Sequence, residues 1–515
     1  MPRKKTKKNL TELTIEDLPN ERLADFLLYS DRHAVIDQHK KTGKLTVAVN
    51  NPEDAQVLDY LRHTSQQEPK IVPSDRASVE HLKQLYHEKL DHEIKNLSGS
   101  PLQADSYTGH RELHNLVEHD TIKNILRSII RLAIHKQASD IHFEPNEQFL
   151  LVRFRIDGIL HDFTSLPLSL HLPLLARLKY LSKLPLRSND VPDRGNLHLH
   201  YDGSKHHAVV VVMPTNNGEK AIVKLTPHSR HLLTLEQLGM SHQSSLQLNA
   251  TLKKTHGMVV VAGPFGSGVT STLYALIQQM NNSAVNITSI EDPIEYPLPR
   301  INQVEVTSEP GLSAESLLNC ALQQDSDIIM LGRLPDNKTA ELATHAAMTG
   351  HLILVSVPAS DAIAALIQMS NLGIPPYQLA ATTNVVIAQR LVRKICLHCR
   401  TSFRLSKKQL KEITVQIPED ALTGLFSHLN EMREGQTVSD LFFYKAVGCP
   451  HCNYSGYLGQ TAIFEFLEMR LPLIDALSEG ASADQLQQIA LRSGMQPLLH
   501  DGMLKAKHGI TTLDE

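Results

Sequence analysis

A glycine-rich turn between an apolar run and a helix-forming segment most constrains how this chain can fold. Residues 258–262 read Met-Val-Val-Val-Ala, and residues 263–268 read Gly-Pro-Phe-Gly-Ser-Gly. Gly263, Gly268 and Thr270 have the spacing of a phosphate-binding loop, G-x-x-x-x-G-K-[ST]. Its glycines let backbone amides converge on an anion at a helix N-terminus, and its hydroxyl ligates magnesium. The predicted nucleotide-binding residues are Gly263, Gly266, Ser267, Gly268, Thr270 and Ser271. The position of the loop lysine, however, is Val269.

The segments around this loop predict a parallel sheet. Apolar runs at 258–262, 286–290, 327–331 and 351–355 alternate with helical segments, which is the pattern of an α/β domain with ligands at the carboxyl ends of the strands. We place this phosphate-loop domain at 231–395.

Size and composition favour a multidomain α/β protein of ordinary globular type. The chain has 515 residues, 41% hydrophobic and 21% charged, with a net charge of -4. This charge gives no argument for a nucleic-acid partner. No apolar run approaches the roughly 18–20 residues of a membrane span, and no signal peptide opens the chain. Five cysteines in so long a chain do not indicate a disulfide scaffold. We therefore expect a cytoplasmic protein with reduced thiols.

The N-terminal part predicts a small module that docks a partner. Residues 1–97 contain helical spacing at 20–30 and 78–90 and strand-like alternation at 43–49. A basic tail precedes them at residues 3–8, which is either a solvated tail or a contact for anionic lipid headgroups. Residues 98–112 are rich in small and polar side chains and are predicted to be a linker.

A second α+β domain is predicted at 113–230. An amphipathic helix at 116–136 precedes strands at 150–156, 196–201, 207–213 and 221–225. His198 and His200 share one strand face, and His206 and His207 lie across a tight turn. A metal site is one reading of these imidazoles, and an exposed polar strand face is the favoured one.

Two C-x-x-C pairs predict a structural zinc site. Cys396, Cys399, Cys449 and Cys452 bracket a mostly polar, helical insertion at 396–452. Four thiolates suit the closed tetrahedral geometry of structural zinc, although the separation is longer than in compact zinc ribbons. Cys320 stands alone on a predicted helix and is expected to be a core residue. Residues 453–515 are expected to form a helical C-terminal region.

Several segments together resemble the type II secretion and type IV pilus assembly ATPases, the GspE and PilB group. They are 139–145, 153–158, the acidic box at 290–296, the Walker B strand at 327–332, 348–351, 388–393 and the paired cysteines. The resemblance implies a RecA-like phosphate-loop core preceded by a PAS-like α+β domain. It also implies a hexameric motor at the cytoplasmic face of a bacterial inner membrane.

The same resemblance makes the departures informative. The family's loop lysine is Val269, its Walker B glutamate is Arg333, and its histidine-box histidine is Pro358. Arginines of the family are also missing at Val209, at Gln323 and within 188–196. The acidic residues Glu291, Asp292 and Glu295 remain.

These losses predict weak ATP and magnesium binding and no self-contained hydrolysis. One lost charge-assisted hydrogen bond costs on the order of 1.5–3 kcal/mol, which weak binding could survive. Catalysis loses more, because a general base contributes roughly 10²–10⁴ in rate and an arginine finger roughly 10³–10⁵.

Two functions remain open. The first is a non-catalytic assembly or regulatory subunit of a secretion or type IV pilus system. It would bind the inner-membrane platform protein and the cytoplasmic domain of a membrane assembly protein, in a ring with itself or an active paralogue. The second is a hydrolysing hexameric motor that uses substitute residues or a partner subunit's active site.

In either case, Arg333 is expected to pair with Glu291 or, failing that, with Asp292 or Glu295. It would take the place of magnesium beside carboxylates whose proton affinities burial should raise.

Overall fold

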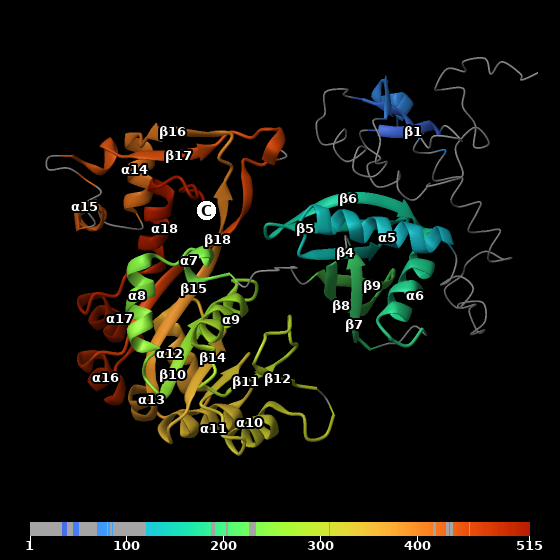
Figure 1. Ribbon diagram of the computed structural model, residues 1–515. Helices are drawn as coiled ribbons and strands as arrows, with labels where there is room; N and C mark the ends of the chain where they lie inside the picture. Colours follow the sequence, from blue (N-terminus) through green and yellow to red (C-terminus); the bar gives the residue numbers. More distant parts are fainter. Residues whose placement is uncertain are drawn as a thin grey trace, which may run out of the picture. The chain divides into compact units, whose positions relative to one another are not determined.

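The computed structural model (Figure 1) describes most of the chain from residue 120 onward and short stretches before it. The described ranges are 33–38, 45–50, 69–79, 81–82, 85, 120–186, 191–201, 204–225, 233–307, 309–415, 419–428, 432, 436–452 and 454–515. The basic tail, the segment 20–30, the linker and the replaced arginine segment at 188–190 lie wholly or partly outside these residues.

The chain divides into two compact units, residues 1–228 and 229–515. The finer division into six segments stays a prediction. None of the helices in the described parts of the chain combines the length and apolar character that a membrane-spanning helix needs.

The described part of the second unit contains a seven-stranded sheet in the order β12-β11-β13-β14-β10-β15-β18. The predicted strands are confirmed as β10 (Gly257–Ala262), β11 (Ile287–Glu291), β13 (Ile328–Leu331) and β14 (Leu352–Val357). β10 pairs in parallel with β14 and with β15 (Thr383–Ile395), and β13 pairs in parallel with β11 and β14. The carboxyl ends of these strands therefore meet at one edge.

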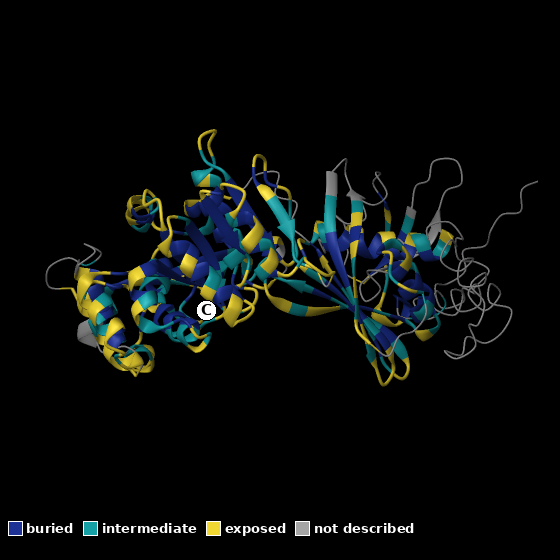
Figure 2. Ribbon diagram, turned by 90° about the horizontal axis from the view of Figure 1, so that it is seen from below, coloured by how far each residue is buried: buried dark blue, intermediate teal, exposed yellow. Residues whose placement is uncertain are grey.

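Helices cover both faces of this sheet, because its strands are apolar on both sides. The side chains of Met258, Val260 and Ala262 face one core cluster, and those of Val259 and Val261 face another. The first cluster takes residues from α10 (Ala314–Leu322), α11 (Asn337–Met348), α12 (Ala362–Asn371), α13 (Pro376–Thr382), α16 (Leu471–Ser478) and α17 (Ala483–Arg492). The second takes residues from α7 (Leu235–Leu238), α8 (His242–Thr251) and α9 (Val269–Met280). Figure 2 shows these central strands as buried between exposed helix surfaces.

The expectation of a wholly helical region after residue 453 was wrong. Its first part is β18 (Tyr457–Glu468), which pairs antiparallel with β15 at the end of the sheet. Thr461, Ala462, Phe464, Glu465 and Leu467 are buried and lie on both faces of this strand, because the sheet is covered on both sides. The helices α16, α17 and α18 (Leu498–Lys507) follow. The short strand β12 (Asn302–Glu305) was also not predicted.

A buried carboxylate joins β18 to two helices. Glu465 accepts hydrogen bonds from the backbone N–H of Ala362 at 2.8 Å and of Leu498 at 3.3 Å, at the starts of α12 and α18. Burial raises the pKa of Glu465, while these two donors lower it. The N-termini of helices favour such an acceptor.

The cysteine-bracketed insertion forms its own small core. β16 (Arg400–Arg404) and β17 (Phe442–Ala446) form a two-stranded antiparallel sheet, which was not predicted, beside α14 (Lys407–Thr414) and α15 (Glu419–His428). Phe426 and Phe443 are buried there with Met503 of α18. The insertion therefore packs on the C-terminal helix.

The described part of the first unit contains a six-stranded antiparallel sheet in the order β6-β5-β4-β9-β8-β7. Its strands are β4 (Asp140–Pro145), β5 (Phe149–Ile156), β6 (Ile159–Pro167), β7 (Asp193–Tyr201), β8 (Ser204–Thr215) and β9 (Gly218–Leu225). The predicted helix is α5 (Asp120–His135), and α6 (His171–Leu181) was not predicted. Nearer the N-terminus, β1 (His33–Gln38), β2 (Leu45–Val49) and β3 (Lys70–Pro73) form a three-stranded sheet, of which β2 was predicted.

A buried ion pair joins α6 to β9. Lys179 Nζ lies 2.7 and 2.8 Å from the two carboxylate oxygens of Glu219, and Lys179 is 1% exposed. The carbonyl oxygen of Glu219 also lies 2.8 Å from Nε2 of the buried His171. The pair leaves neither charge unsatisfied in the interior.

We predict that Lys179→Met destabilises this region by about 3–5 kcal/mol, because Glu219 would remain buried without its cation. The chain has no tryptophan whose fluorescence could report unfolding. Hydrogen–deuterium exchange of the α6 and β9 amides is therefore the suitable measurement. Lys123→Met is the control. Lys123 lies 3.8 Å from the exposed Asp120, and such surface pairs contribute at most about 1 kcal/mol. Equal effects of the two substitutions would contradict the prediction.

Candidate nucleotide and metal sites

The glycine-rich loop connects the buried β10 to α9 and needs its glycines. Gly266 and Gly268 have φ angles of 79° and 81°, in the left-handed region that favours glycine. A Cβ on Gly263 would lie 2.2 Å from Ser267 Oγ and 2.9 Å from the Gln389 carbonyl oxygen. The loop therefore keeps the backbone form of an anion-binding turn at a helix N-terminus.

Gln389 of the neighbouring strand β15 fixes this loop by hydrogen bonds. Its Nε2 donates to the Ser267 carbonyl oxygen at 2.7 Å, and its Oε1 accepts from the Thr272 hydroxyl at 2.5 Å. Gln389 and Thr272 are both buried. These two bonds fix both the loop and the first turns of α9 to the neighbouring strand.

Val269 occupies the lysine position, and its side chain points toward the core of the second unit. Its partly buried side chain packs against the core cluster of β10 and α9. The first turn of α9 thus presents Thr270 and Ser271, both half-buried, without a side-chain cation from position 269. The tip residue Phe265 is 88% exposed.

The acidic box begins with a fully engaged carboxylate. Glu291 ends β11 and is 2% exposed. It accepts hydrogen bonds from the Tyr274 hydroxyl, from Ser289 Oγ at 2.5 Å and from Gln303 Nε2 at 3.1 Å. Burial and the adjacent Glu291 carboxylate raise the pKa of Tyr274, which keeps the phenol protonated as a donor. Glu291 is satisfied by neutral donors and needs no cation.

Glu295 contacts the loop helix. Burial raises its pKa, and repulsion from Glu291 adds to this, while a hydrogen bond from Thr270 opposes it. The expected rise in proton affinity is therefore confirmed for Glu295. Its partner Thr270 is the residue whose hydroxyl would ligate magnesium in an intact loop.

Arg333 pairs with Asp292 and not with its first expected partner. Arg333 follows β13, and its guanidinium nitrogen lies 3.8 Å from Asp292 Oδ2. Glu291 is unavailable because its donors already surround it. Arg333 and Asp292 are 50% and 41% exposed, and pairs of this kind contribute about 0–1 kcal/mol. Pro358 follows β14 on the same edge and is exposed.

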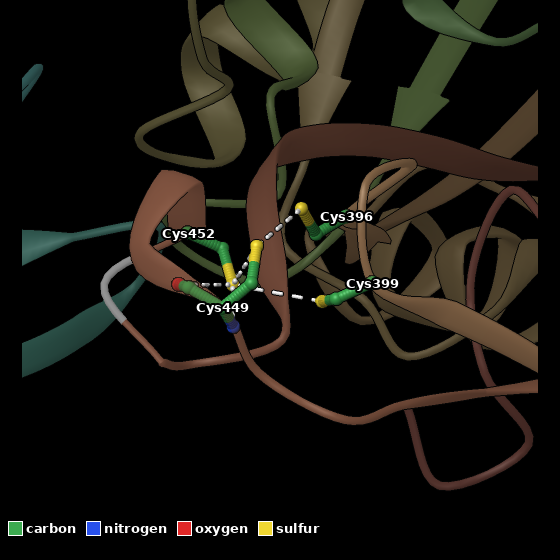
Figure 3. A group of neighbouring side chains, drawn as sticks. All are labelled: Cys396, Cys399, Cys449 and Cys452. Atoms are coloured by element: carbon green, nitrogen blue, oxygen red, sulfur yellow. Dashed lines mark hydrogen bonds between the residues drawn. The ribbon is translucent and has the colours of Figure 1, made fainter.

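The four paired cysteines converge as predicted (Figure 3). Their sulfur atoms all lie within 4.8 Å of one another. Three of the distances are 3.8 Å for Cys396–Cys449, 3.8 Å for Cys399–Cys452 and 3.7 Å for Cys449–Cys452. Four sulfurs at these distances could hold a metal ion.

Backbone donors support the thiolate form of Cys452, whereas burial raises the pKa of Cys396 to about 11 and also raises that of Cys399. The N–H groups of Cys449 and Gly456 each donate to Cys452 Sγ at 3.2 Å. Burial acts to raise the pKa of Cys452, but these donors outweigh it and lower the pKa to about 7. A thiolate is the form that binds metal.

The four histidines considered as a metal site in the sequence do not form one cluster. His198 pairs with His207 across β7 and β8, with ring centroids 5.2 Å apart. His206 pairs with Leu199 and so lies on the opposite face of the sheet. The His200 side chain lies outside the described residues. Within those residues, the cysteines make up the one group of three or more His, Cys, Asp or Glu side chains that could hold a metal.

The expectation of a buried Cys320 was wrong. Cys320 is exposed on α10, whose buried residues are Ala314, Leu318 and Ala321. Position 320 lies two residues beyond Leu318, which is the solvent side of a helix with this buried face.

Sequence reasoning assigned no role to Gln389, Tyr274 or Gln303. Tyr274 lies among apolar residues of α9, and its buried hydroxyl required a partner, which was the one available signal. Gln389 lies more than 100 residues from the groups it contacts, so no local pattern could indicate it. Gln303 lies 12 residues from Glu291, on the unpredicted strand β12.

A family model and sequence relatives agree on the family of this chain. The model of the family described as "Type II/IV secretion system protein" matches residues 115–515. The type IV pilus assembly ATPase PilB of Myxococcus xanthus is 31% identical over 94% of this chain and 84% of its own length. The type II secretion system protein HxcR of Pseudomonas aeruginosa is 33% identical over 76% of each chain.

Structural comparison shows the same fold at low sequence identity. The ATPase DotB of Legionella pneumophila has a TM-score of 0.53 and 15% identity, over 76% of this chain and 93% of DotB. The pilus retraction motor PilT has a TM-score of 0.50 and 22% identity, over 76% and 95%. The second unit is therefore the RecA-like fold of secretion ATPases, and the chain belongs to the type II/IV secretion system protein family.

Proposed function

We propose that this protein is a non-catalytic assembly or regulatory subunit of a type II secretion or type IV pilus system. The observation that carries the proposal is Val269, which occupies the lysine position of an otherwise intact phosphate loop and packs, partly buried, against the core. A lysine there would neutralise phosphate charge, and phosphoryl transfer depends almost entirely on such positioning and neutralisation.

The other residues at the carboxyl edge of the main sheet support the same conclusion. Arg333 stands at the family's glutamate position and lies beside Asp292, and Pro358 cannot act as an acid or base. The hydroxyl of Thr270, the usual magnesium ligand, interacts with Glu295 and acts to lower the pKa of that carboxyl. The residues present fit ATP and magnesium only through the loop backbone, and we propose weak nucleotide binding without turnover.

The partners follow from the family. PilB is by its name an assembly ATPase, and HxcR is a type II secretion protein. We propose that this chain works at the inner membrane of a bacterium from the cytoplasmic side. It would join a hexameric ring with itself or an active paralogue. It would also contact the platform protein and the cytoplasmic domain of a membrane assembly protein.

We also propose that the four-cysteine cluster holds zinc in a structural role, and that the described part of the first unit is a PAS-like domain. Tetrahedral Cys₄ coordination is the closed form of structural zinc sites. The cluster joins the end of β15 to the segment before β18, so zinc would fasten the insertion to the main sheet.

The full chain should release no phosphate from ATP above background. The measurement is a phosphate-release assay with an intact family ATPase as the positive control. Gly268→Val, which would distort the loop, identifies any residual activity that belongs to this site. Turnover that Gly268→Val abolishes would contradict the proposal and favour a motor with substitute residues.

Val269→Lys should tighten ATP binding without creating turnover. One charge-assisted hydrogen bond of about 1.5–3 kcal/mol corresponds to about ten- to a hundredfold in affinity. Arg333 and Pro358 would still leave the site without its base. Binding of a fluorescent ATP analogue and phosphate release are measured together, with Val269→Ala as the control for lost packing. Appreciable hydrolysis by Val269→Lys would show that the other replacements matter little.

Purified protein should retain one zinc ion per chain after dialysis against a weak chelator. Cys399→Ser should lose it, because a structural site needs all four ligands. Cys320→Ser is the matched control, since Cys320 is exposed and outside the cluster. Elemental analysis measures the zinc, and an unchanged content in Cys399→Ser would exclude the site.

A further inference from the structure

One cross-strand pair of histidines stands apart from the functions described so far. His198 of β7 and His207 of β8 lie directly opposite each other in an antiparallel pair. Strands β7 and β8 lie side by side at one end of the six-stranded sheet, where β7 is the outer strand in the described residues (Figure 1). His198 is exposed and His207 is half-buried. Solvent therefore reaches the pair from one side.

The two rings have the relation that shared coordination requires. Their centroids are 5.2 Å apart and their planes are inclined by 55°. The lone pair of an imidazole nitrogen lies in the ring plane, so inclined rings can direct two nitrogens at one point. Metal–imidazole bonds of about 2.0–2.1 Å fit between rings at this separation.

The state of His207 also favours a ligand role. Its Nδ1 is buried and has no hydrogen-bond partner among the described residues. A buried nitrogen without a partner is unusual in a folded protein and is open to a ligand.

A second histidine pair shows what a mere contact looks like. His398 and His451 lie 4.2 Å apart with an interplanar angle of 20°. Their planes are nearly parallel, so their lone pairs run side by side and do not converge. This pair is a stacking contact between the two cysteine knuckles.

We propose that His198 and His207 form a two-imidazole site for a divalent first-row transition metal, Ni²⁺, Cu²⁺ or Zn²⁺. Imidazole ligands suit these ions, and water completes the coordination. The site lies in the first unit and does not depend on the phosphate loop or on the cysteine cluster. The metal would fasten the outer strand β7 to β8.

Nickel titration of the full-length, zinc-loaded chain tests the proposal. The probe is Ni²⁺ alone, measured by calorimetry, because copper would oxidise the thiols. The chain has 28 histidines, so the result rests on the difference between variants. His198→Ala and His207→Ala should each weaken one nickel site by at least about tenfold, the lower bound for losing even a supporting residue of a metal site.

His206→Ala is the matched control. His206 is adjacent to His207 in sequence but on the opposite face of β8, so this variant should bind nickel as the unaltered chain does. Circular dichroism without metal confirms folding. If His207→Ala disturbs packing, the exposed His198→Ala alone decides the outcome. Nickel binding unchanged by His198→Ala, or weakened equally by His206→Ala, would overturn the proposal.

Discussion

The position of β10 between two parallel neighbours is the constraint on which the candidate nucleotide site depends. β10 pairs along its length with β14, and with β15 from Met258 to Ala262. This arrangement brings the glycine loop, Pro358 and Gln389 to one edge. Strand β13 pairs with both β11 and β14, so Glu291 and Arg333 reach the same edge. Residues up to 126 positions apart in the chain meet there only because all these strands run in one direction.

At that edge, the protein keeps the structure of a phosphate site while changing its charges. Two of the glycines retain the left-handed backbone that the turn requires. Gln389 fixes the loop to β15 by hydrogen bonds. The position of the loop cation is taken by Val269, whose partly buried side chain packs against the core. Glu291 remains as a buried carboxylate, but Tyr274, Ser289 and Gln303 satisfy it. These neutral donors therefore stabilise the buried carboxylate without a bound cation.

The cysteines and the histidines show why similar sequence patterns had different outcomes. Each C-x-x-C pair forms a tight turn, and the antiparallel pairing of β15 with β18 brings the two turns together. The convergence of four sulfurs follows from that pairing. Four histidines on a hairpin cannot converge in the same way, because neighbours in a strand point to opposite faces. His207 and His206 are separated for this reason, and among the described side chains of the four the register pair His198–His207 stays close.

The sequence by itself determined the elements whose signals are local. The apolar runs indicated the four central strands, the glycine spacing indicated the loop, and the cysteine spacing indicated the four-cysteine cluster. Tertiary structure decided everything that depends on distant pairing or on burial. It placed β18 as a strand of the main sheet, Cys320 on the solvent side of α10, and Asp292 rather than Glu291 beside Arg333. In each case, the deciding quantity was which face a packed neighbour covers or which donors already surround a charge, and neither is encoded in local residue spacing.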